Sequence, residues 1–246
     1  MKKIAILSIK GGVGKTTTTI NLGHGLSLNG QRVILLDCDP QNNLAEIFDL
    51  ELGGGISDLL LGRKAWMNEV RRNLFVIPSG GRALMDAEWK VATAKRRESV
   101  LRESLEDLAN CDYVICDCSS AMNLININVL HFVDYVIIPV GMDYFSISGL
   151  KNTFEMVRDV CRNGSEHQVR LLGILATQFD LRTRVSREIY GVLSRLFPNE
   201  LFRTVINVNT RLRESPAYGK TIFEYDIASS GARDYFKLTS EILAHD

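Results

Sequence analysis

The chain has 246 residues, and its 29 Lys and Arg balance its 29 Asp and Glu, so the formal net charge is zero. This balance argues against attraction to nucleic acid through the overall charge. The sequence has no signal-peptide pattern and no apolar run long enough to cross a membrane, so we expect a cytoplasmic protein without a membrane span. Strand and helix patterns alternate without a Pro-, Ser- or Gly-rich linker, which predicts a single domain over residues 1–246.

The first predicted elements are a short apolar strand at residues 4–7, a glycine-rich turn and a helix. The turn reads Lys10-Gly11-Gly12-Val13-Gly14-Lys15-Thr16-Thr17. Glycines let successive backbone N–H groups point at a phosphate, and the following helix adds its positive dipole end. We expect Lys15 to reach the β- and γ-phosphates of a nucleoside triphosphate and Thr16 to hold Mg²⁺. Ile9 replaces the usual first glycine, and Lys10 is an addition that ordinary phosphate loops do not need.

Aspartates follow two further apolar strands. Strand 33–36 leads into Asp37 and Asp39, and Pro40 prevents the strand from continuing, so these carboxylates should lie at its C-terminal end. Ligands of open α/β sheets bind at that edge, where one carboxylate could orient water for attack on the γ-phosphate. A solvated, Asp-rich turn is the alternative interpretation. Strand 113–116 ends in Asp117, the usual second element of a Mg²⁺ site in phosphate-loop enzymes.

The remaining elements continue the alternation of strand and helix. Strands are predicted at residues 74–77, 135–140, 171–176 and 204–206, and helices near 93–109, 146–161, 183–197 and 231–244. With a hydrophobic fraction of 46%, this order predicts an α/β fold, a doubly wound and mostly parallel sheet flanked by helices.

Basic residues are concentrated in residues 182–220. This segment has few acids and carries Arg182, Arg184, Arg187, Arg195, Arg203, Arg211, Arg213 and Lys220. Such a patch can bind a nucleic-acid backbone without reading its sequence. The alternative interpretation is a solvated, arginine-rich face of a helix.

The five cysteines, at positions 38, 111, 116, 118 and 161, do not form a metal-binding pattern. Cys116 and Cys118 lie on and just after a buried strand, and no second pair completes a zinc site. We therefore interpret them as buried, reduced thiols.

Together these motifs resemble the ParA/MinD family of ATPases with a deviant Walker A motif, over nearly the whole chain. The turn with Thr18 matches the family's loop, residues 37–41 match its D-x-D-P-Q, and residues 113–117 match its Y-x-(apolar)₂-D strand. Pro139-Val140, Tyr144-Phe145 and Gly149-Leu150 resemble its P-V-x-x-E-Y-F-x-x-x-G-L.

The C-terminal third is most similar to the partition branch of the family. Residues 180–183 resemble its D-x-R-T, residues 209–220 its N-V-R-L-S-E-A-P-S-x-G-K, and residues 225–232 its Y-D-x-x-S-x-G-A. The chain departs from the pattern at three places. Asn207-Val208 occupy the positions where the family usually has Pro-Arg beside the adenine. Ser119-Ser120 replace the Pro-Pro that follows the aspartate corresponding to Asp117. Asn42-Asn43 replace Gly-Asn.

The resemblance implies roles for particular residues. Lys15 and Asp39 would act in catalysis together with Lys10, the signature lysine, which reaches the phosphates of a partner subunit. The nucleotide would be bound by Gly11, Gly12, Val13, Gly14, Lys15, Thr16, Thr17, Thr177 and Asn209. Thr16 and Asp117 would hold Mg²⁺, with Asp37 a secondary candidate, and Arg182 and Arg211 would bind DNA. Ordinary loop polarity is the alternative interpretation of Thr177 and Asn209.

The resemblance also implies a function and partners. We expect an ATPase that forms an ATP-dependent homodimer, binds DNA non-specifically on the nucleoid, and partitions or positions a plasmid, chromosome or protein cargo. A ParB-like protein or cargo adaptor would stimulate hydrolysis. Two alternatives stay open: a MinD-type membrane-cycling ATPase, and a metal-cluster or electron-transfer carrier that uses Cys118. The C-terminal segment 235–246 carries one lysine and ends in Asp246, unlike a basic membrane-binding helix.

Overall fold

The computed structural model, which describes residues 1–51, 53–162 and 168–245, has a seven-stranded sheet at its centre. The strand order is β3-β4-β2-β5-β1-β6-β7. All neighbours are parallel except β3, which pairs antiparallel with β4 at the edge. The strands are β1 (Lys2–Ile6), β2 (Val33–Cys38), β3 (Asn68–Arg71), β4 (Leu74–Ile77), β5 (Tyr113–Cys118), β6 (Tyr135–Gly141) and β7 (Arg170–Thr177).

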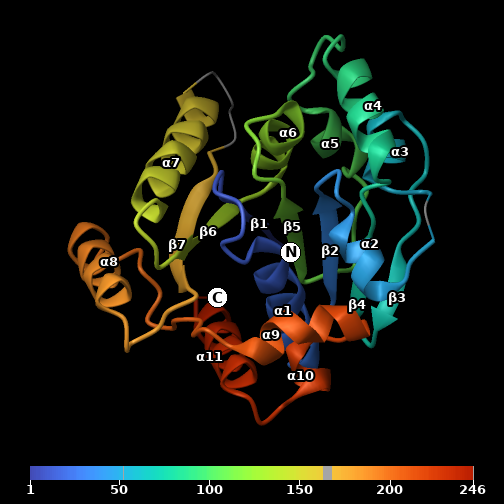
Figure 1. Cartoon of the computed structure of the whole chain (residues 1–246). Helices are drawn as coiled ribbons and strands as arrows, with labels where there is room; N and C mark the ends of the chain where they lie inside the picture. The colour runs from blue at the N-terminus through green and yellow to red at the C-terminus, as the bar shows by residue number, and fades with distance from the viewer. Residues whose placement is uncertain (52, 163–167, 246) are drawn as a thin grey trace.

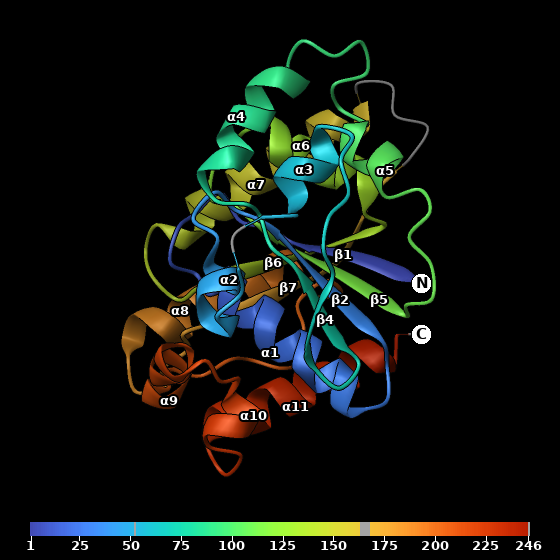
Figure 2. The same ribbon diagram turned by 90° about the vertical axis from the view of Figure 1, so that its right-hand side faces the viewer.

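Helices cover both faces of this sheet. They are α1 (Lys15–Leu28), α2 (Asn43–Phe48), α3 (Ile56–Leu60), α4 (Arg82–Val91), α5 (Val100–Ser104), α6 (Leu124–Phe132), α7 (Ser146–Arg162), α8 (Arg184–Leu196), α9 (Thr210–Glu214), α10 (Ile222–Tyr225) and α11 (Ser230–Leu243), with a 3₁₀ turn at Ser215–Tyr218. Figure 1 shows the sheet between them, and Figure 2 shows α3 to α7 on one face and α1, α9, α10 and α11 on the other.

Each face of the sheet has its own hydrophobic core. Alternate residues of β2 point to opposite faces, so Ile34 packs in the core beneath α3 to α7, and Leu35 packs in the core beneath α1 and α11. Strands β2 and β5 are buried along their whole length. This double cover explains why the central strands are continuous apolar runs rather than alternating ones. Each fully buried Leu or Ile stabilises the fold by about 1.5–3 kcal/mol.

The predicted doubly wound, mostly parallel sheet is confirmed, but two of the predicted elements are wrong. Residues 204–206 form no strand. Among the described residues, the isolated bridges of this part of the chain lie on either side of them, from Leu201 to Ile174 and from Asn207 to Phe179. Residues 93–99 are turns, and the helix predicted at 93–109 is limited to α5. The main helix of this region lies earlier, in α4, because Leu84, Ala87 and Val91 form its buried face.

None of the described helices combines the length and apolarity needed to cross a bilayer. The apolar residues Tyr235, Leu238 and Ile242 of α11 are almost fully buried against the body of the protein. Asp246, at the end of the segment compared above with a membrane-binding helix, lies outside the described residues.

Candidate active site

The glycine-rich turn lies at the carboxyl end of β1, near the centre of the sheet. β1 pairs with β5 and β6, so the turn is flanked by the ends of both strands. Gly12 and Gly14 have φ angles of 72° and 88°, which L side chains rarely adopt. Gly14 directly precedes Lys15, the first residue of α1. The backbone therefore folds into a turn with the amino end of a fourteen-residue helix beneath it, which is a geometry that binds phosphate.

Lys15 is held across the mouth of this turn. Its Nζ donates to the hydroxyl of Ser120 at 2.6 Å and to the carbonyl of Lys10 at 3.3 Å. Only 8% of the residue is exposed. Burial lowers the pKa of the amine, while Asp117 opposes that change. A buried cation that contacts neutral oxygens gains from the arrival of an anion, so Lys15 is suited to bind phosphate.

Asp117 and Asp37 are register partners on the neighbouring strands β5 and β2. Oδ1 of Asp117 accepts from the hydroxyl of Thr19 at 3.2 Å, whereas its buried Oδ2 has no hydrogen-bond partner among the described residues. Burial raises the pKa of Asp117 to about 7. An unsatisfied buried carboxylate oxygen at the carboxyl edge of the sheet fits a Mg²⁺ ion or its water, because hard cations take oxygen ligands.

Asp37 has a different environment from Asp117. Its two carboxylate oxygens accept backbone N–H groups of Leu44 at 2.9 Å and of Asp39 at 3.1 Å. The residue is fully buried, and burial raises its pKa well above the usual value. Asp37 thus fixes the backbone between β2 and α2. Asp39 is half-buried at the end of this fixed turn and accepts from the N–H of Gln41 at 2.9 Å.

Lys10 is bound to the start of α7 in its own chain. Its Nζ forms an ion pair with Asp143 and donates to the hydroxyl of Ser146 at 3.0 Å. The backbone N–H of Ile9 donates to Thr153 Oγ1 at 3.1 Å. A Cβ on Gly149 would lie only 2.9 Å from Lys10 Cβ, so this glycine leaves room for the lysine side chain. Asp143 is not among the residues predicted from the sequence, although the family motif has an acidic residue directly before its Tyr-Phe pair, at the position of Asp143.

A cavity of roughly 300 Å³ lies beside the turn. It is lined by Val13, Gly14, Thr17, Thr177, Gln178, Ile206, Asn207, Val208, Asn209, Leu212, Arg213, Pro216 and Tyr235. Thr177 and Asn209 therefore lie in the wall of a cavity that the glycine-rich turn also lines. Thr177 Oγ1 donates to the carbonyl of Val13 at 2.8 Å, so its hydroxyl also supports the turn.

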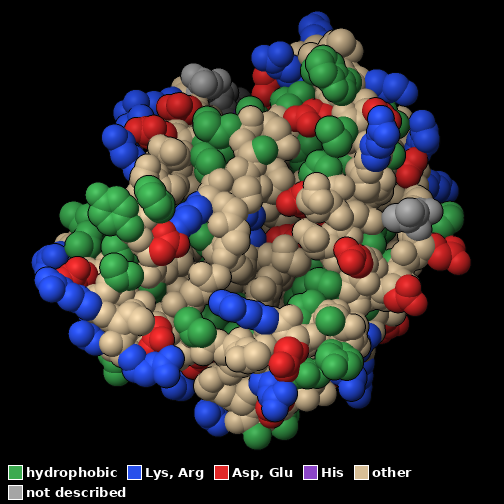
Figure 3. Space-filling model, in the orientation of Figure 1, with side chains coloured by type: hydrophobic (Ala, Val, Ile, Leu, Met, Phe, Trp, Pro, Cys, Tyr) green, Lys and Arg blue, Asp and Glu red, His purple; other side chains and the backbone are tan. Residues whose placement is uncertain are grey.

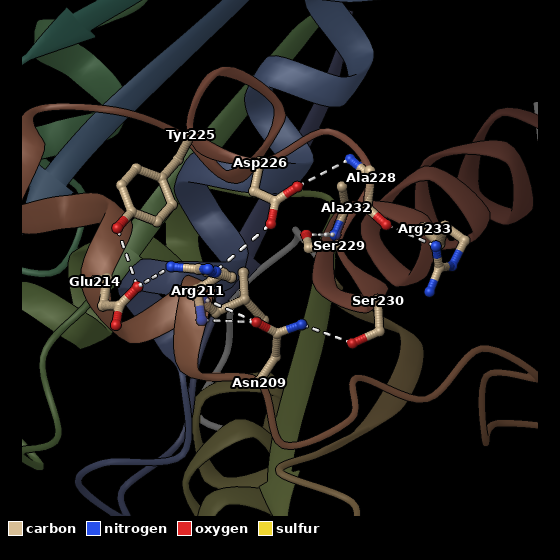
Figure 4. A network of polar contacts seen from close by, with 11 residues as sticks. Asn209, Arg211, Glu214, Tyr225, Asp226, Ala228, Ser229, Ser230, Ala232 and Arg233 are labelled. Carbon is tan, nitrogen blue, oxygen red and sulfur yellow. Dashed lines mark hydrogen bonds and ion pairs between the residues drawn. The ribbon is translucent and has the colours of Figure 1, made fainter.

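The side chain of Asn209 caps α9 and is not directed freely into the cavity. Its Oδ1 accepts from the N–H groups of Arg211 and Leu212 at 2.8 and 3.3 Å, and its Nδ2 donates to Ser230 Oγ at 2.6 Å. Figure 4 shows this network at the start of α9. Asn207 is bonded to Asp234 at 2.9 Å. These amides therefore shape the wall of the cavity through the backbone they hold.

The basic residues predicted between 182 and 220 are exposed, and three of them, Arg182, Arg184 and Arg211, form ion pairs with carboxylates. Arg182 makes two contacts with Asp180, at 2.9 and 2.8 Å, and Arg184 pairs with Glu188. Arg211 contacts Glu214 at 3.0 Å and Asp226 at 3.5 Å, as Figure 4 shows. In Figure 3, Lys and Arg side chains gather at the left edge over α8, with acidic side chains between them, and a hollow opens in the middle of this face.

The fold, the turn and the carboxylates at the sheet edge define a phosphate-loop nucleoside triphosphatase. A family model described as an AAA domain matches residues 1–170. The chromosome-partitioning ATPase Soj of Treponema pallidum is 35% identical over 251 residues, covering 100% of this chain and 98% of that protein. The sporulation initiation inhibitor protein Soj of Bacillus subtilis is 36% identical, with 99% of each chain covered. The chain belongs to the ParA/MinD family of deviant Walker A ATPases.

Solved structures of similar proteins share this fold. A cobyrinic acid a,c-diamide synthase from Mycobacterium smegmatis with a bound ATP analogue and magnesium has a TM-score of 0.83 and 25% identity, and the match covers 100% of this chain and 95% of that one. Apo McdA from Cyanothece has a TM-score of 0.88 and 24% identity, and the match covers 99% of both chains. At this low identity the McdA comparison bears on the fold alone.

Proposed function

We propose that this protein is a partition ATPase that dimerises with ATP, binds DNA non-specifically, and moves or positions a cargo whose partner protein stimulates hydrolysis. The activity itself rests on relatives that match the whole chain: the protein is an ATPase of the partition type that uses ATP and Mg²⁺. The observation that carries the proposal is the combination of Lys10 with the loop around Lys15 in one site. An ordinary phosphate loop binds its nucleotide without a lysine at the position of Lys10.

The site supports a division of labour among its residues. The N–H groups of residues 11–17 and the amine of Lys15 would bind the phosphates. Thr16 and Asp117 would hold Mg²⁺, which neutralises charge on the γ-phosphate. Asp39, on the turn fixed by Asp37, would orient the attacking water. Asp37 itself is assigned here to the turn, because both its oxygens already accept backbone N–H groups.

The proposed dimer requires the Lys10 side chain to give up its contact with Asp143 and to reach the nucleotide of the partner subunit. Within one chain the amine is paired with Asp143 just before α7, and the lysine side chain is 23% exposed. Phosphoryl transfer depends on charge stabilisation at the γ-phosphate, so a lysine supplied by a partner subunit would couple hydrolysis to dimerisation. Arg182 and Arg211 are exposed on neighbouring segments and would contact the DNA backbone by exchanging their carboxylate partners for phosphates.

Two alternatives are less well supported by the observed burial. A membrane-cycling ATPase needs an unpacked amphipathic segment, whereas the apolar face of α11 is packed on the core. A metal-cluster carrier would need Cys118 at the surface, whereas this thiol is 1% exposed and burial raises its pKa.

The direct test is DNA binding with ATP, with ADP and without nucleotide, measured by electrophoretic mobility shift or fluorescence anisotropy on DNA of unrelated sequences. Salt-sensitive binding that requires ATP and ignores sequence supports the proposal. Equal binding in all three nucleotide states would count against it. ATP-dependent binding to liposomes instead of DNA would favour the membrane-cycling alternative.

A further inference from the structure

Ser120 lies beside the phosphate loop, and the proposed function gives it no role in catalysis or binding. Its hydroxyl accepts from Lys15 Nζ at 2.6 Å. A Cβ added to Gly11 would lie 3.7 Å from Ser120 Oγ, so the hydroxyl is also close to the backbone of the glycine-rich turn. The hydroxyl is therefore next to the amine that binds the β- and γ-phosphates, on the side that leads to Asp117.

The loop that carries Ser120 is held firmly on both sides of it. The amide nitrogen of Asn126, in α6, donates to the carbonyl of Ser119 at 3.0 Å and to the carbonyl of Ala121 at 2.7 Å. Asn126 is fully buried. Farther along, the N–H of Leu124 donates to Glu88 on α4 at 2.8 Å, which ties the start of α6 to the neighbouring helix. The position of Ser120 is thus set by the contacts of its loop with α6.

A serine at position 120 distinguishes this chain from the family motif that the chain resembles. Two prolines usually follow the aspartate at positions 119 and 120. A proline at 120 would have neither a hydroxyl nor an N–H to offer. Here Ser119 is used within the loop, where its hydroxyl accepts from the side chain of Asn123 at 3.4 Å. Ser120 is half-buried and directs its hydroxyl to Lys15.

We propose that Ser120 is a γ-phosphate ligand, whose hydroxyl accepts from Lys15 in this structure and donates to the γ-phosphate when ATP binds. This inference rests on the proposed ATPase function. Lys15 would turn from Ser120 to the phosphates, because a charge-assisted hydrogen bond to phosphate is stronger than one to a neutral hydroxyl. The freed hydroxyl would then lie within reach of the terminal phosphate and would distinguish ATP from ADP, which has no γ-phosphate.

The test compares the affinities of the Mg²⁺ complexes of AMPPNP and ADP by isothermal titration calorimetry. Ser120→Ala should weaken AMPPNP binding about tenfold or more, the effect of losing one hydrogen bond to a charged group, and should leave ADP binding unchanged or slightly stronger. Ser120→Thr keeps a hydroxyl and should restore most of the AMPPNP affinity. Retained ADP binding also shows that each variant is folded.

Ser119→Ala is the matched control, because it removes a neighbouring hydroxyl whose contacts are with its own loop and with Asn126 of α6. An equal gain in affinity for both nucleotides in Ser120→Ala would overturn the proposal, since Ser120 would then only compete with the phosphates for Lys15. The same loss of AMPPNP affinity in Ser119→Ala would also overturn it, since the cause would be loop distortion. Wild-type protein that binds neither nucleotide would instead contradict the ATPase function on which the proposal rests.

Discussion

Lys10 and Asp143 form an ion pair within one chain, although 133 positions separate them in the sequence. The pair joins the phosphate loop to the start of α7, and Ser146 adds a hydrogen bond to the same amine. The lysine that is expected to act on the nucleotide of a partner subunit is thus bound by residues of its own chain. Dimerisation must replace this contact with a contact to the partner's nucleotide.

We predict that Asp143→Asn strengthens ATP-dependent dimerisation, because the variant no longer competes for Lys10. The carboxylate is half exposed, so solvent screens the pair and the gain should be modest, up to about fivefold in the dimer dissociation constant. Analytical ultracentrifugation with AMPPNP measures it. Asp180→Asn, which removes the carboxylate partner of Arg182 just after β7, is a control that should not change dimerisation. A weaker dimer in Asp143→Asn would show that the carboxylate positions Lys10 for its work in trans.

Variants of Lys15 and Asp39 should affect ATP binding and ATP hydrolysis differently. Lys15→Ala removes the buried amine at the phosphate loop, so ATP binding should be lost. Asp39→Ala leaves the loop intact, so binding should stay near the wild-type value while turnover falls about 10²-fold or more, as expected on losing a group that orients or activates water. Calorimetry and phosphate release measure the two effects. Wild-type hydrolysis by Asp39→Ala would show that another residue orients the water.

The buried carboxylate of Asp117 should make the metal-free protein sensitive to pH. Burial raises its pKa to about 7, so the folded state keeps a proton that the unfolded state releases near pH 4. Stability of the metal-free protein should therefore fall as pH rises from about 4 to 7, because the folded state binds more protons there. Urea unfolding of wild type and Asp117→Asn at pH 5 and pH 8 measures this.

The asparagine variant should lose much of that pH dependence and should no longer be stabilised by Mg²⁺ with nucleotide. Asp37→Asn is the comparison variant, because burial also raises the pKa of Asp37 while its oxygens are occupied by backbone N–H groups. It should weaken the fold without abolishing the effect of Mg²⁺. An Asp117→Asn protein with the wild-type pH profile and response to Mg²⁺ would contradict the assigned role.

For DNA binding, Arg182→Ala and Arg211→Ala should each weaken affinity to a similar extent on every sequence. Each loss of one phosphate contact should reduce the slope of log affinity against log salt concentration by about 1. Arg158→Ala on α7, an exposed arginine beside Asp159, is the control and should leave the slope unchanged. A loss that depends on DNA sequence, or an equal loss in the control, would argue against backbone contacts by these two arginines.

Local patterns were sufficient to predict much of the fold and to propose the residues of the site. The turn from Lys10 to Thr17 is contiguous in sequence, so its strand, glycines and helix could be read directly, and the ends of β2 and β5 gave Asp39 and Asp117. Contacts between distant segments could not be read this way. Nothing near Asp37 indicates that both its oxygens bind the backbone, and nothing near Lys10 indicates its pairing with Asp143.

The wrong predictions have similar causes. Residues 204–206 have the composition of a strand, but they form no bridge with β7, and the isolated bridges of this segment lie on either side of them, at Leu201 and Asn207. The segment near residue 95 is rich in helix-forming residues, yet it has no apolar stripe to pack, and the helix forms in α4 where such a stripe exists.

The most direct test of the account is the oligomeric state of Asp39→Ala, measured by light scattering after gel filtration with saturating ATP. We predict a dimer with ATP, a monomer with ADP or without nucleotide, and a monomer in all three conditions once Lys10→Ala is added to the same variant. A protein that stays monomeric with ATP although Asp39 is replaced would contradict the claim that a second subunit completes the site.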